Sequence, residues 1–329
     1  MNYRPFGSTD LLVSEIGLGC SEIGSGVFYR NEWESLRVLN RAFELGINFY
    51  DTAELYGYGH SEELIGRAFK GRRSRVIIAT KVGMLTSSLG RIGKTLLPIL
   101  QPVRQVIQPW KDALRRVSKQ RQDFSSTHIR KAIEQSLRRL HTDYLDLYQL
   151  HNPPTRVIEE GEVFETLDYL KDQGKIRFYG VSAETISDAL LCLRYPNISS
   201  LQVVFNLLEP EAAKELLPLS HQKGIAIIAR VPLARGLLTN KMTTQTGPPL
   251  NRNQMQIARA KVEKLLSLVN EKVRSLPQTA IQFILNHPQV SVVIPGTRTV
   301  KHLEENIATL NVPPLTEEEL ERIALLSSS

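Results

Sequence analysis

Residues 46–69 read "GINFYDTAELYGYGHSEELIGRAF" and contain one complete strand–loop–helix unit. Ile47–Tyr50 is a short, continuous apolar run, as expected for a parallel strand that is buried on both faces. Ser61–Lys70 has the apolar spacing of a helix, and a glycine follows it. Two polar residues, Asp51 and Tyr56, lie between the strand and the helix. The stretch therefore predicts a β-then-α unit that carries chemical groups in its connecting loop.

The same unit recurs along the whole chain. Eight strands are predicted, at Ile16–Cys20, Ile47–Tyr50, Val76–Thr80, Tyr144–Leu150, Arg177–Val181, Leu201–Phe205, Ala226–Arg230 and Ser291–Ile294. Helical patterns follow them, at Glu32–Leu45, Ser61–Lys70, Thr127–Leu140, Glu162–Gln173, Thr185–Arg194, Pro210–Lys223, Pro277–Asn286 and Val300–Leu310. Eight right-handed β-then-α units close into a (β/α)₈ TIM barrel, an α/β fold. An open doubly wound sheet is the alternative, but "GLGCSEIGSG" does not fit G-x-G-x-x-G leading into a helix.

Three further segments flank or interrupt the repeats. Residues 3–17 have two β-like pieces around a turn and predict a hairpin that closes the barrel floor. Arg252–Ser275 predicts an extra helix before the seventh barrel helix. Thr316–Leu326 predicts a C-terminal helix in which Thr316 and Glu319 form a capping box. Residues 1–329 are thus interpreted as one barrel domain.

Composition limits the class of protein. The 329 residues include two cysteines, Cys20 and Cys192, without the spacing of a metal site, so neither a metal nor a disulfide framework is expected. No apolar run approaches the roughly 20 residues that span a bilayer, and the N-terminus lacks an apolar signal core. We therefore expect a soluble, cytoplasmic protein. Composition makes no prediction about its oligomeric state.

The net charge of +7 comes from a single segment. Leu85–Gln122 holds eight basic residues and one acid, whereas the rest of the chain holds 33 of each sign. A basic face on the folded core is typical of nucleic-acid binding, so a local cluster argues against such a partner.

This segment, residues 85–122, forms a basic insertion between the third strand and its helix. Apolar residues recur in it at helical spacing, and three prolines interrupt the pattern, which predicts two or three short helices. Three roles stay open. The segment is a surface loop packed on the barrel, a lid over the mouth, or a docking surface for an anionic membrane or an acidic protein. The packed loop is the favoured interpretation.

Polar residues sit at or just after the ends of successive predicted strands: Asp51, Tyr56, Lys81 and His151. Taken singly, each has an ordinary structural explanation as a turn former, a solvated strand edge or a loop residue. In a closed barrel, however, these strand ends converge on one mouth. There Lys81 would pull the pKa of the Tyr56 phenol down, and Asp51 would keep the lysine charged. With His151 placing a carbonyl oxygen, the set suits protonation of a developing alkoxide, which means carbonyl reduction.

Several longer stretches together resemble the aldo-keto reductases over nearly the whole chain. These stretches are "GINFYDTAELYGYGHSEELIGRAF", "VIIATKVG", "SLRRLHTDYLDLYQLHNP", "GKIRFYGVS", "VPLARGLLTNK" and "VVIPGTRTVKHLEENI". The resemblance implies a (β/α)₈ barrel with NADPH or NADP⁺ bound at its C-terminal mouth. It also places the family's catalytic tetrad on Asp51, Tyr56, Lys81 and His151.

The resemblance also implies a set of cofactor contacts. They fall on Gly19, Cys20, Ser182, Gln202, Arg230, Leu233, Gly236, Lys241, Arg298, His302, Glu305 and Asn306. Two positions depart from the family pattern: Ala183 stands where Asn usually follows the serine, and Arg230 stands where an aromatic ring often stacks on the nicotinamide. Arg298 falls at the 2′-phosphate position. Because a guanidinium suits bidentate phosphate recognition, NADPH is preferred to NADH.

The substrate is expected to be a small carbonyl compound, with Tyr29, Trp33, Tyr58 and Asn152 as candidate pocket walls. Two other functions stay open. One is a regulatory NADP(H)-binding barrel resembling the potassium-channel β subunits, which would dock a partner through the basic insertion. The other is a lyase or isomerase barrel without a cofactor. Turnover on a panel of aldehydes separates the reductase from the regulatory module.

The basic insertion is expected to be dispensable for cofactor binding. Deleting residues 85–122 should leave NADPH affinity in place, because the implied cofactor residues all lie outside that segment. The enhancement of NADPH fluorescence on binding measures this affinity. Loss of all binding by a truncated protein that is still folded would contradict the expectation.

Overall fold

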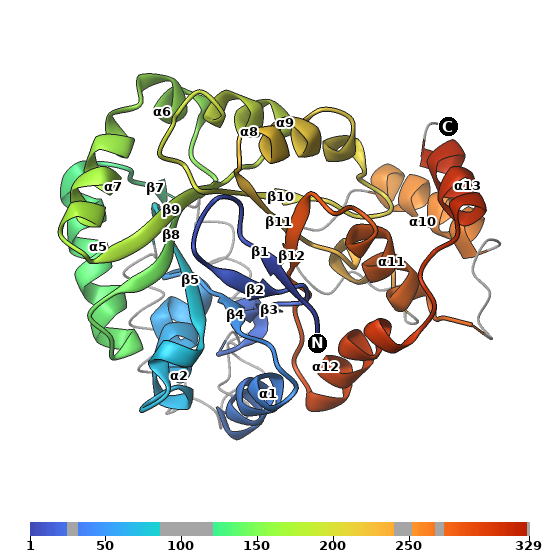
Figure 1. Cartoon of the computed structure of the whole chain (residues 1–329), viewed down its shortest axis with the longest axis horizontal. Helices are drawn as coiled ribbons and strands as arrows, with labels where there is room; N and C mark the ends of the chain where they lie inside the picture. Colours follow the sequence, from blue (N-terminus) through green and yellow to red (C-terminus); the bar gives the residue numbers. More distant parts are fainter. Residues whose placement is uncertain (25–31, 86–120, 240–251, 267–272, 328–329) are drawn as a thin grey trace, which may run out of the picture.

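In the computed structural model, which describes residues 1–24, 32–85, 121–239, 252–266 and 273–327, eight parallel strands form one curved sheet (Figure 1). In chain order they are β3 (Leu18–Gly19), β4 (Phe49–Asp51), β5 (Ile77–Val82), β8 (Leu145–His151), β9 (Ile176–Ser182), β10 (Ser200–Val204), β11 (Ala226–Arg230) and β12 (Val290–Val293). Parallel bridges join Ile16 to Val293 and Gly19 to Gly296, so β3 meets β12 and the barrel closes. The predicted (β/α)₈ barrel and its eight strands are confirmed.

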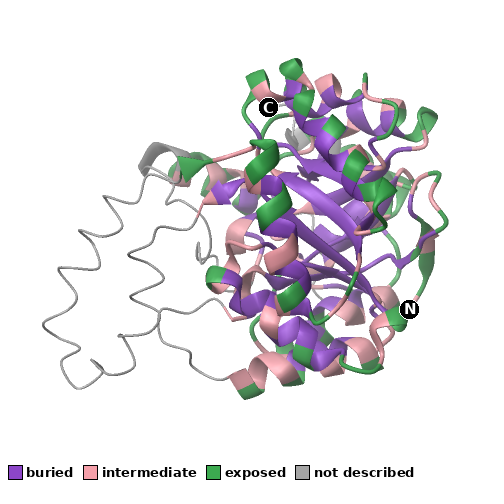
Figure 2. Cartoon of the chain, turned by 90° about the vertical axis from the view of Figure 1, so that its left-hand side faces the viewer, coloured by how far each residue is buried: buried purple, intermediate pink, exposed green. Residues whose placement is uncertain are grey.

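Helices surround the sheet. The barrel helices are α1 (Glu32–Glu44), α2 (His60–Ala68), α5 (Ser126–Leu140), α7 (Glu162–Asp172), α8 (Ile186–Cys192), α9 (Leu216–Gln222), α11 (Leu276–Leu285) and α12 (Val300–Ile307). The additional ones are α6 (Thr155–Glu160), α10 (Arg252–Leu266) and α13 (Glu317–Ser327). Figure 2 shows burial concentrated in the strands and on the helix faces that cover them. Every helix predicted within the described residues is present, and α6 was not predicted. Residues 267–272 of the predicted extra helix, and the short helices predicted in the basic insertion, lie outside the described part.

One predicted helix has a different start. Pro210–Lys223 was expected to be continuous, but the structure has a 3₁₀ turn, Glu211–Ala213, before α9 begins at Leu216. Pro218 explains the break. Proline has no backbone N–H to donate, and a helix that starts at Leu216 places it in the first turn, where N–H groups have no intrahelical partner anyway.

Side chains alternate between the inside and the outside of the barrel. On β5, Ile77 and Ala79 belong to the interior apolar cluster, whereas Ile78 and Val82 belong to the layer between sheet and helices. Successive side chains of a strand point to opposite faces, so Lys81 shares the inward side with Ile77 and Ala79. The apolar interior thus ends in polar groups at the mouth.

The N-terminal hairpin closes the other end of the barrel, as predicted. Its strands are β1 (Tyr3–Pro5) and β2 (Leu12–Ser14), and in Figure 1 they lie across the ring of strands. Phe6, Leu11 and Val13 pack into the interior cluster. This floor leaves the C-terminal mouth as the open end of the barrel.

The basic insertion leaves and returns through a two-stranded ladder, in which β6 (Met84–Leu85) pairs with β7 (Arg121–Gln122). The Gln122 side-chain amide donates to the Asn152 carbonyl at 2.8 Å, so the base of the insertion lies beside the end of β8. Residues 86–120 lie outside the described part of the chain. The three roles proposed for the segment therefore stay predictions.

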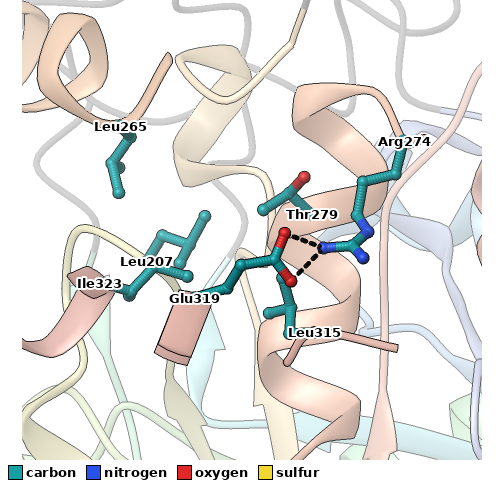
Figure 3. A pocket seen from close by; sticks show the side chains of 7 residues that line it. All are labelled: Leu207, Leu265, Arg274, Thr279, Leu315, Glu319 and Ile323. Atoms are coloured by element: carbon teal, nitrogen blue, oxygen red, sulfur yellow. Dashed lines mark hydrogen bonds and ion pairs between the residues drawn. The ribbon is translucent and has the colours of Figure 1, made fainter. Parts of the chain in front are cut away.

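The C-terminal helix α13 has the predicted capping box. The Thr316 hydroxyl accepts from the Glu319 amide at 3.2 Å, and the Glu319 carboxylate accepts from the Thr316 amide at 2.8 Å. The same carboxylate holds the buried Arg274 guanidinium at 2.8 and 2.9 Å, as Figure 3 shows. This ion pair connects α13 to the start of α11. The apolar side chains around it are those of Leu207, Leu265, Leu315 and Ile323. None of the described helices is long and apolar enough to cross a membrane.

Replacing Glu319 by Gln should destabilise the protein. The side chain of Arg274 is only 5% exposed and would lose its counter-charge, while the amide can still accept from Thr316. We expect the free energy of unfolding to fall by about 1–2 kcal/mol, measured by urea denaturation. Glu318→Gln is the matched control, because it removes an exposed pair with Arg322 and should cost less than about 0.5 kcal/mol. Equal losses in the two variants would contradict the argument.

Candidate active site

Inward-pointing polar side chains gather at the C-terminal ends of six neighbouring strands. They are Asp51 on β4, Lys81 on β5, Gln149 and His151 on β8, Ser182 on β9, Gln202 on β10 and Arg230 on β11. The strand register aligns them, pairing Lys81 with Gln149, His151 with Ser182, and Ser182 with Gln202. Parallel strands end at the same edge, so residues far apart in the sequence meet at one mouth.

A buried ion pair forms the centre of this group. Lys81 Nζ donates to Asp51 Oδ2 at 2.5 Å and to the Thr52 carbonyl at 2.9 Å, and the lysine side chain is 1% exposed. Burial alone would lower the pKa of Lys81, but Asp51 and Tyr56 outweigh it, so this pKa is raised and the ammonium stays charged. The other carboxylate oxygen, Oδ1, accepts from Gln149 at 3.2 Å and from Gln202 at 2.8 Å.

Tyr56 reaches the ion pair through a tight turn. The 3₁₀ turn Tyr56–Gly59 contains Gly57 and Tyr58 with φ of 58° each, and a Cβ on Gly57 would lie 2.3 Å from the Gly24 carbonyl oxygen. Only glycine fits this left-handed position at such close approach. The turn brings the Tyr56 hydroxyl to 3.5 Å from Lys81 Nζ.

The pKa of Tyr56 differs from the sequence-based expectation. Lys81 was expected to lower it, with Asp51 supporting the lysine. Instead burial raises the pKa of Tyr56, the Lys81 ammonium lowers it by less, and Asp51 itself raises it because the carboxylate disfavours a nearby phenolate. The phenol therefore holds its proton well above neutral pH.

His151 is neutral and faces Tyr56. Its pKa is well below the usual value because it is buried, and the positive charges of Lys81 and Arg230 lower it further. The two rings are edge-to-face with centroids 6.1 Å apart. His151 Nδ1 is buried and has no hydrogen-bond partner among the described residues. The mouth thus presents a protonated phenol and a neutral imidazole beside a fixed positive charge, which suits proton donation to an oxygen that is gaining negative charge.

A cleft of about 760 Å³ opens beside these groups, within the range of small-molecule and cofactor sites. Nine of the predicted cofactor residues line it: Gly19, Gln202, Arg230, Leu233, Gly236, Arg298, His302, Glu305 and Asn306. Asp51 and Tyr56 line its inner end. Ser182 is buried behind this surface, where its hydroxyl donates to Gln202 Oε1 at 3.3 Å.

Other predicted residues lie elsewhere. Cys20 begins the 3₁₀ turn that follows β3, and its thiol is buried in the apolar layer between the sheet and the helices, where burial raises its pKa. Cys20 is not among the residues that line the cleft, and its predicted cofactor contact stays a prediction. Trp33 lies on the outer helix α1, 65% exposed and stacked on Arg37, so it does not form a wall of the cleft.

Of the remaining predicted pocket residues, Asn152 directly follows His151 at the end of β8. Its amide donates to Glu184 Oε2 at 2.6 Å, and its oxygen lies 3.5 Å from the Ser182 hydroxyl. Tyr58 is 42% exposed and does not line the cleft. Tyr29 and Lys241 lie outside the residues that the structure describes.

Several polar residues of the site were not predicted. They are Gln149 at the ion pair and, around the cleft, Ser21, Glu22, Arg235, Ser275, Gln278 and Lys301. A signal existed for Gln149, because it lies two positions before His151 on the same strand and therefore on the same face. The others come from loops and helix starts, where the sequence carries no periodic signal.

Charged side chains of both signs line the cleft, and the cations outnumber the three carboxylates of Glu22, Asp51 and Glu305. Four cationic side chains reach it, those of Arg230, Arg235, Arg298 and Lys301. The buried Nε of Arg230 has no hydrogen-bond partner among the described residues. In the described ranges, no group of three or more His, Cys, Asp or Glu is arranged to hold a metal ion.

Comparison with known proteins gives a consistent result. A sequence model of the aldo/keto reductase family matches residues 15–327. The chain is 33% identical over 333 residues to the uncharacterized oxidoreductase YqkF of Bacillus subtilis (strain 168), covering 98% of this chain and 95% of that protein. It is similar to the holo form of aldo-keto reductase AKR11C1 from Bacillus halodurans, with 31% identity, a TM-score of 0.78 and 99% and 96% of the two chains covered. A Klebsiella pneumoniae aldo/keto reductase in complex with NADP and acetate is 25% identical, with a TM-score of 0.72 and the same coverage.

Removing one charge of the Asp51–Lys81 pair should lower the free energy of unfolding more than removing both charges. Lys81→Met leaves a buried carboxylate without its ammonium, and we expect the free energy of unfolding to fall by about 3–5 kcal/mol. Asp51→Asn should likewise cost several kcal/mol. The double variant should be more stable than Lys81→Met alone. Urea denaturation of the four proteins tests this, and a double variant whose loss equals the sum of the two single losses would show that the charges are not coupled.

Proposed function

Because the chain belongs to the aldo/keto reductase family, we propose that it reduces an aldehyde or ketone to the alcohol with NADPH as the hydride donor. One observation carries the proposal. The protonated Tyr56 phenol lies against the buried Lys81–Asp51 ion pair, at the inner end of a cleft lined with cationic side chains. Bound NADPH would supply the hydride, and the protein would supply the proton and the orientation.

Two residues, Tyr56 and His151, act on the carbonyl oxygen in this proposal, and Lys81 acts on Tyr56. Tyr56 donates its Oη proton as negative charge develops there, and the Lys81 ammonium stabilises the phenolate that remains. The neutral imidazole of His151 donates a hydrogen bond that orients the carbonyl. Its neutrality matters, because a neutral ring does not add a second full positive charge beside Lys81.

Asp51 acts one step further away. It holds Lys81 charged and directed toward Tyr56, although its own charge raises the pKa of the phenol. The structure therefore supports a phenol that burial keeps protonated until negative charge develops on the carbonyl oxygen. It does not support a phenol that is partly ionised beforehand.

The proposed cofactor contacts follow the cleft. Ser182 and Gln202 would hold the nicotinamide amide, and Arg230 would lie over the ring, since a planar guanidinium can stack on it. Leu233, Gly236 and Lys241 would hold the diphosphate, whereas Arg298, His302, Glu305 and Asn306 would surround the adenosine half. Gly19 lines the same cleft and, without a side chain, allows close approach.

The proposed substrate is a small carbonyl compound that enters beside Asn152. Both cysteines of the chain are free, buried thiols, which accords with a cytoplasmic, reducing location as part of the proposal.

Tyr56→Phe should abolish most carbonyl reduction and keep NADPH binding. The variant removes the proton donor without changing the ring, so the turnover rate should fall by about 10²–10⁴. Steady-state reduction of a small aldehyde such as methylglyoxal measures the rate, and NADPH fluorescence measures binding.

Tyr58→Phe serves as the comparison within the same turn. Its hydroxyl does not contact Lys81, so the rate should fall by less than tenfold, on the order of one hydrogen bond. Full activity of Tyr56→Phe would refute the assignment of the donor, and a wild-type protein that binds NADPH but turns over no aldehyde would refute the reductase.

A further inference from the structure

An ion pair crosses the outer part of the cleft. Arg298, in the loop after β12, donates from Nε to a carboxylate oxygen of Glu22, at the end of the 3₁₀ turn Cys20–Glu22 after β3. Both residues line the cleft. The pair therefore spans the seam where the first and last barrel strands meet, beside the bridge between Gly19 and Gly296.

The two partners differ in how firmly they are held. The Glu22 side chain is 13% exposed, whereas that of Arg298 is 55% exposed. A Cβ on Gly296 would lie 4.0 Å from Glu22 Cγ, so the acid's stem lies close to the backbone of the β12 loop. Backbone hydrogen bonds from Gly19 to Pro295 at 3.2 Å and from Ile23 to Cys20 at 3.1 Å fix its turn. Glu22 is thus the more buried partner, with its turn held by backbone hydrogen bonds, and Arg298 is the more exposed one.

A guanidinium presents its donors in one planar fork, which binds carboxylate and phosphate in the same way. A fork that holds Glu22 has fewer donors to offer a phosphate. We propose that Glu22 is a cofactor-selectivity residue: it competes with the 2′-phosphate of NADPH for Arg298 and so lowers the preference for NADPH over NADH. This inference rests on the proposed function, in which Arg298 meets the 2′-phosphate.

The other charges of the cleft do not provide this discrimination. Lys301 is 82% exposed and pairs with Glu305 at 3.9 Å, and Arg230 reaches toward Glu184 at 3.5 Å. In the proposed function Arg230 lies over the nicotinamide ring, a group that NADPH and NADH share. Among the described residues that line the cleft, the Glu22–Arg298 pair is the one that places a carboxylate on the guanidinium proposed to bind the 2′-phosphate.

The test compares dissociation constants for NADPH and NADH, measured by nicotinamide fluorescence at low ionic strength. In Glu22→Gln, the NADPH constant should fall about two- to five-fold, as expected for the loss of a competing exposed ion pair, while the NADH constant changes much less. The control is Glu304→Gln on α12. It removes the same charge from an exposed pair with Arg41 of α1, and neither residue lines the cleft. It should leave the ratio of the two constants unchanged.

A second experiment, in the Arg298→Met variant, distinguishes failure of this inference from failure of the proposed function. Arg298→Met should remove most of the preference for NADPH. Adding Glu22→Gln to this variant should then leave the ratio of the two dissociation constants unchanged. If Arg298→Met leaves the preference intact, the assignment of the 2′-phosphate site in the proposed function is wrong. If Arg298→Met removes it but Glu22→Gln leaves the ratio unchanged, or tightens both cofactors equally, competition by Glu22 is refuted and the reductase assignment stands.

Discussion

The charge of Asp51 is the constraint on which the rest of the site depends. A buried carboxylate is tolerated only when donors surround it. Lys81, Gln149 and Gln202 supply those donors from β5, β8 and β10. Four strands are thereby tied together at the mouth through one side chain. The same lysine then stands 3.5 Å from Tyr56, so the interaction that satisfies the buried charge also defines where the phenol sits.

That arrangement works only because the strands keep their alternation. A shift of one residue on β5 would turn Lys81 toward the helices and Thr80 toward the mouth. The apolar interior prevents it, since Ile77 and Ala79 fill the barrel below Lys81 and the hairpin residue Phe6 fills the floor. Packing at the closed end therefore aligns the chemistry at the open end.

Burial, more than the neighbouring charges, sets the protonation states of Tyr56 and His151. It raises the pKa of Tyr56 and lowers that of His151, so both groups are neutral beside the charged Lys81–Asp51 pair. Farther out, burial has less influence, because the cations Arg298 and Lys301 are exposed. There Arg298, which is 55% exposed, pairs with Glu22. The inner end of the cleft is suited to chemistry and the outer end to recognising a ligand.

The sequence by itself determined the barrel and the tetrad. Eight apolar runs alternating with helical patterns predict the topology, and Asp51, Lys81 and His151 stand at strand ends where parallel strands must converge. What it could not determine were energies and partners that depend on distance and burial. The sign of the Tyr56 pKa shift follows from desolvation, which outweighs an ammonium 3.5 Å away. The pairing of Glu22 with Arg298 joins residues 276 positions apart, because barrel closure places the first and last strands side by side.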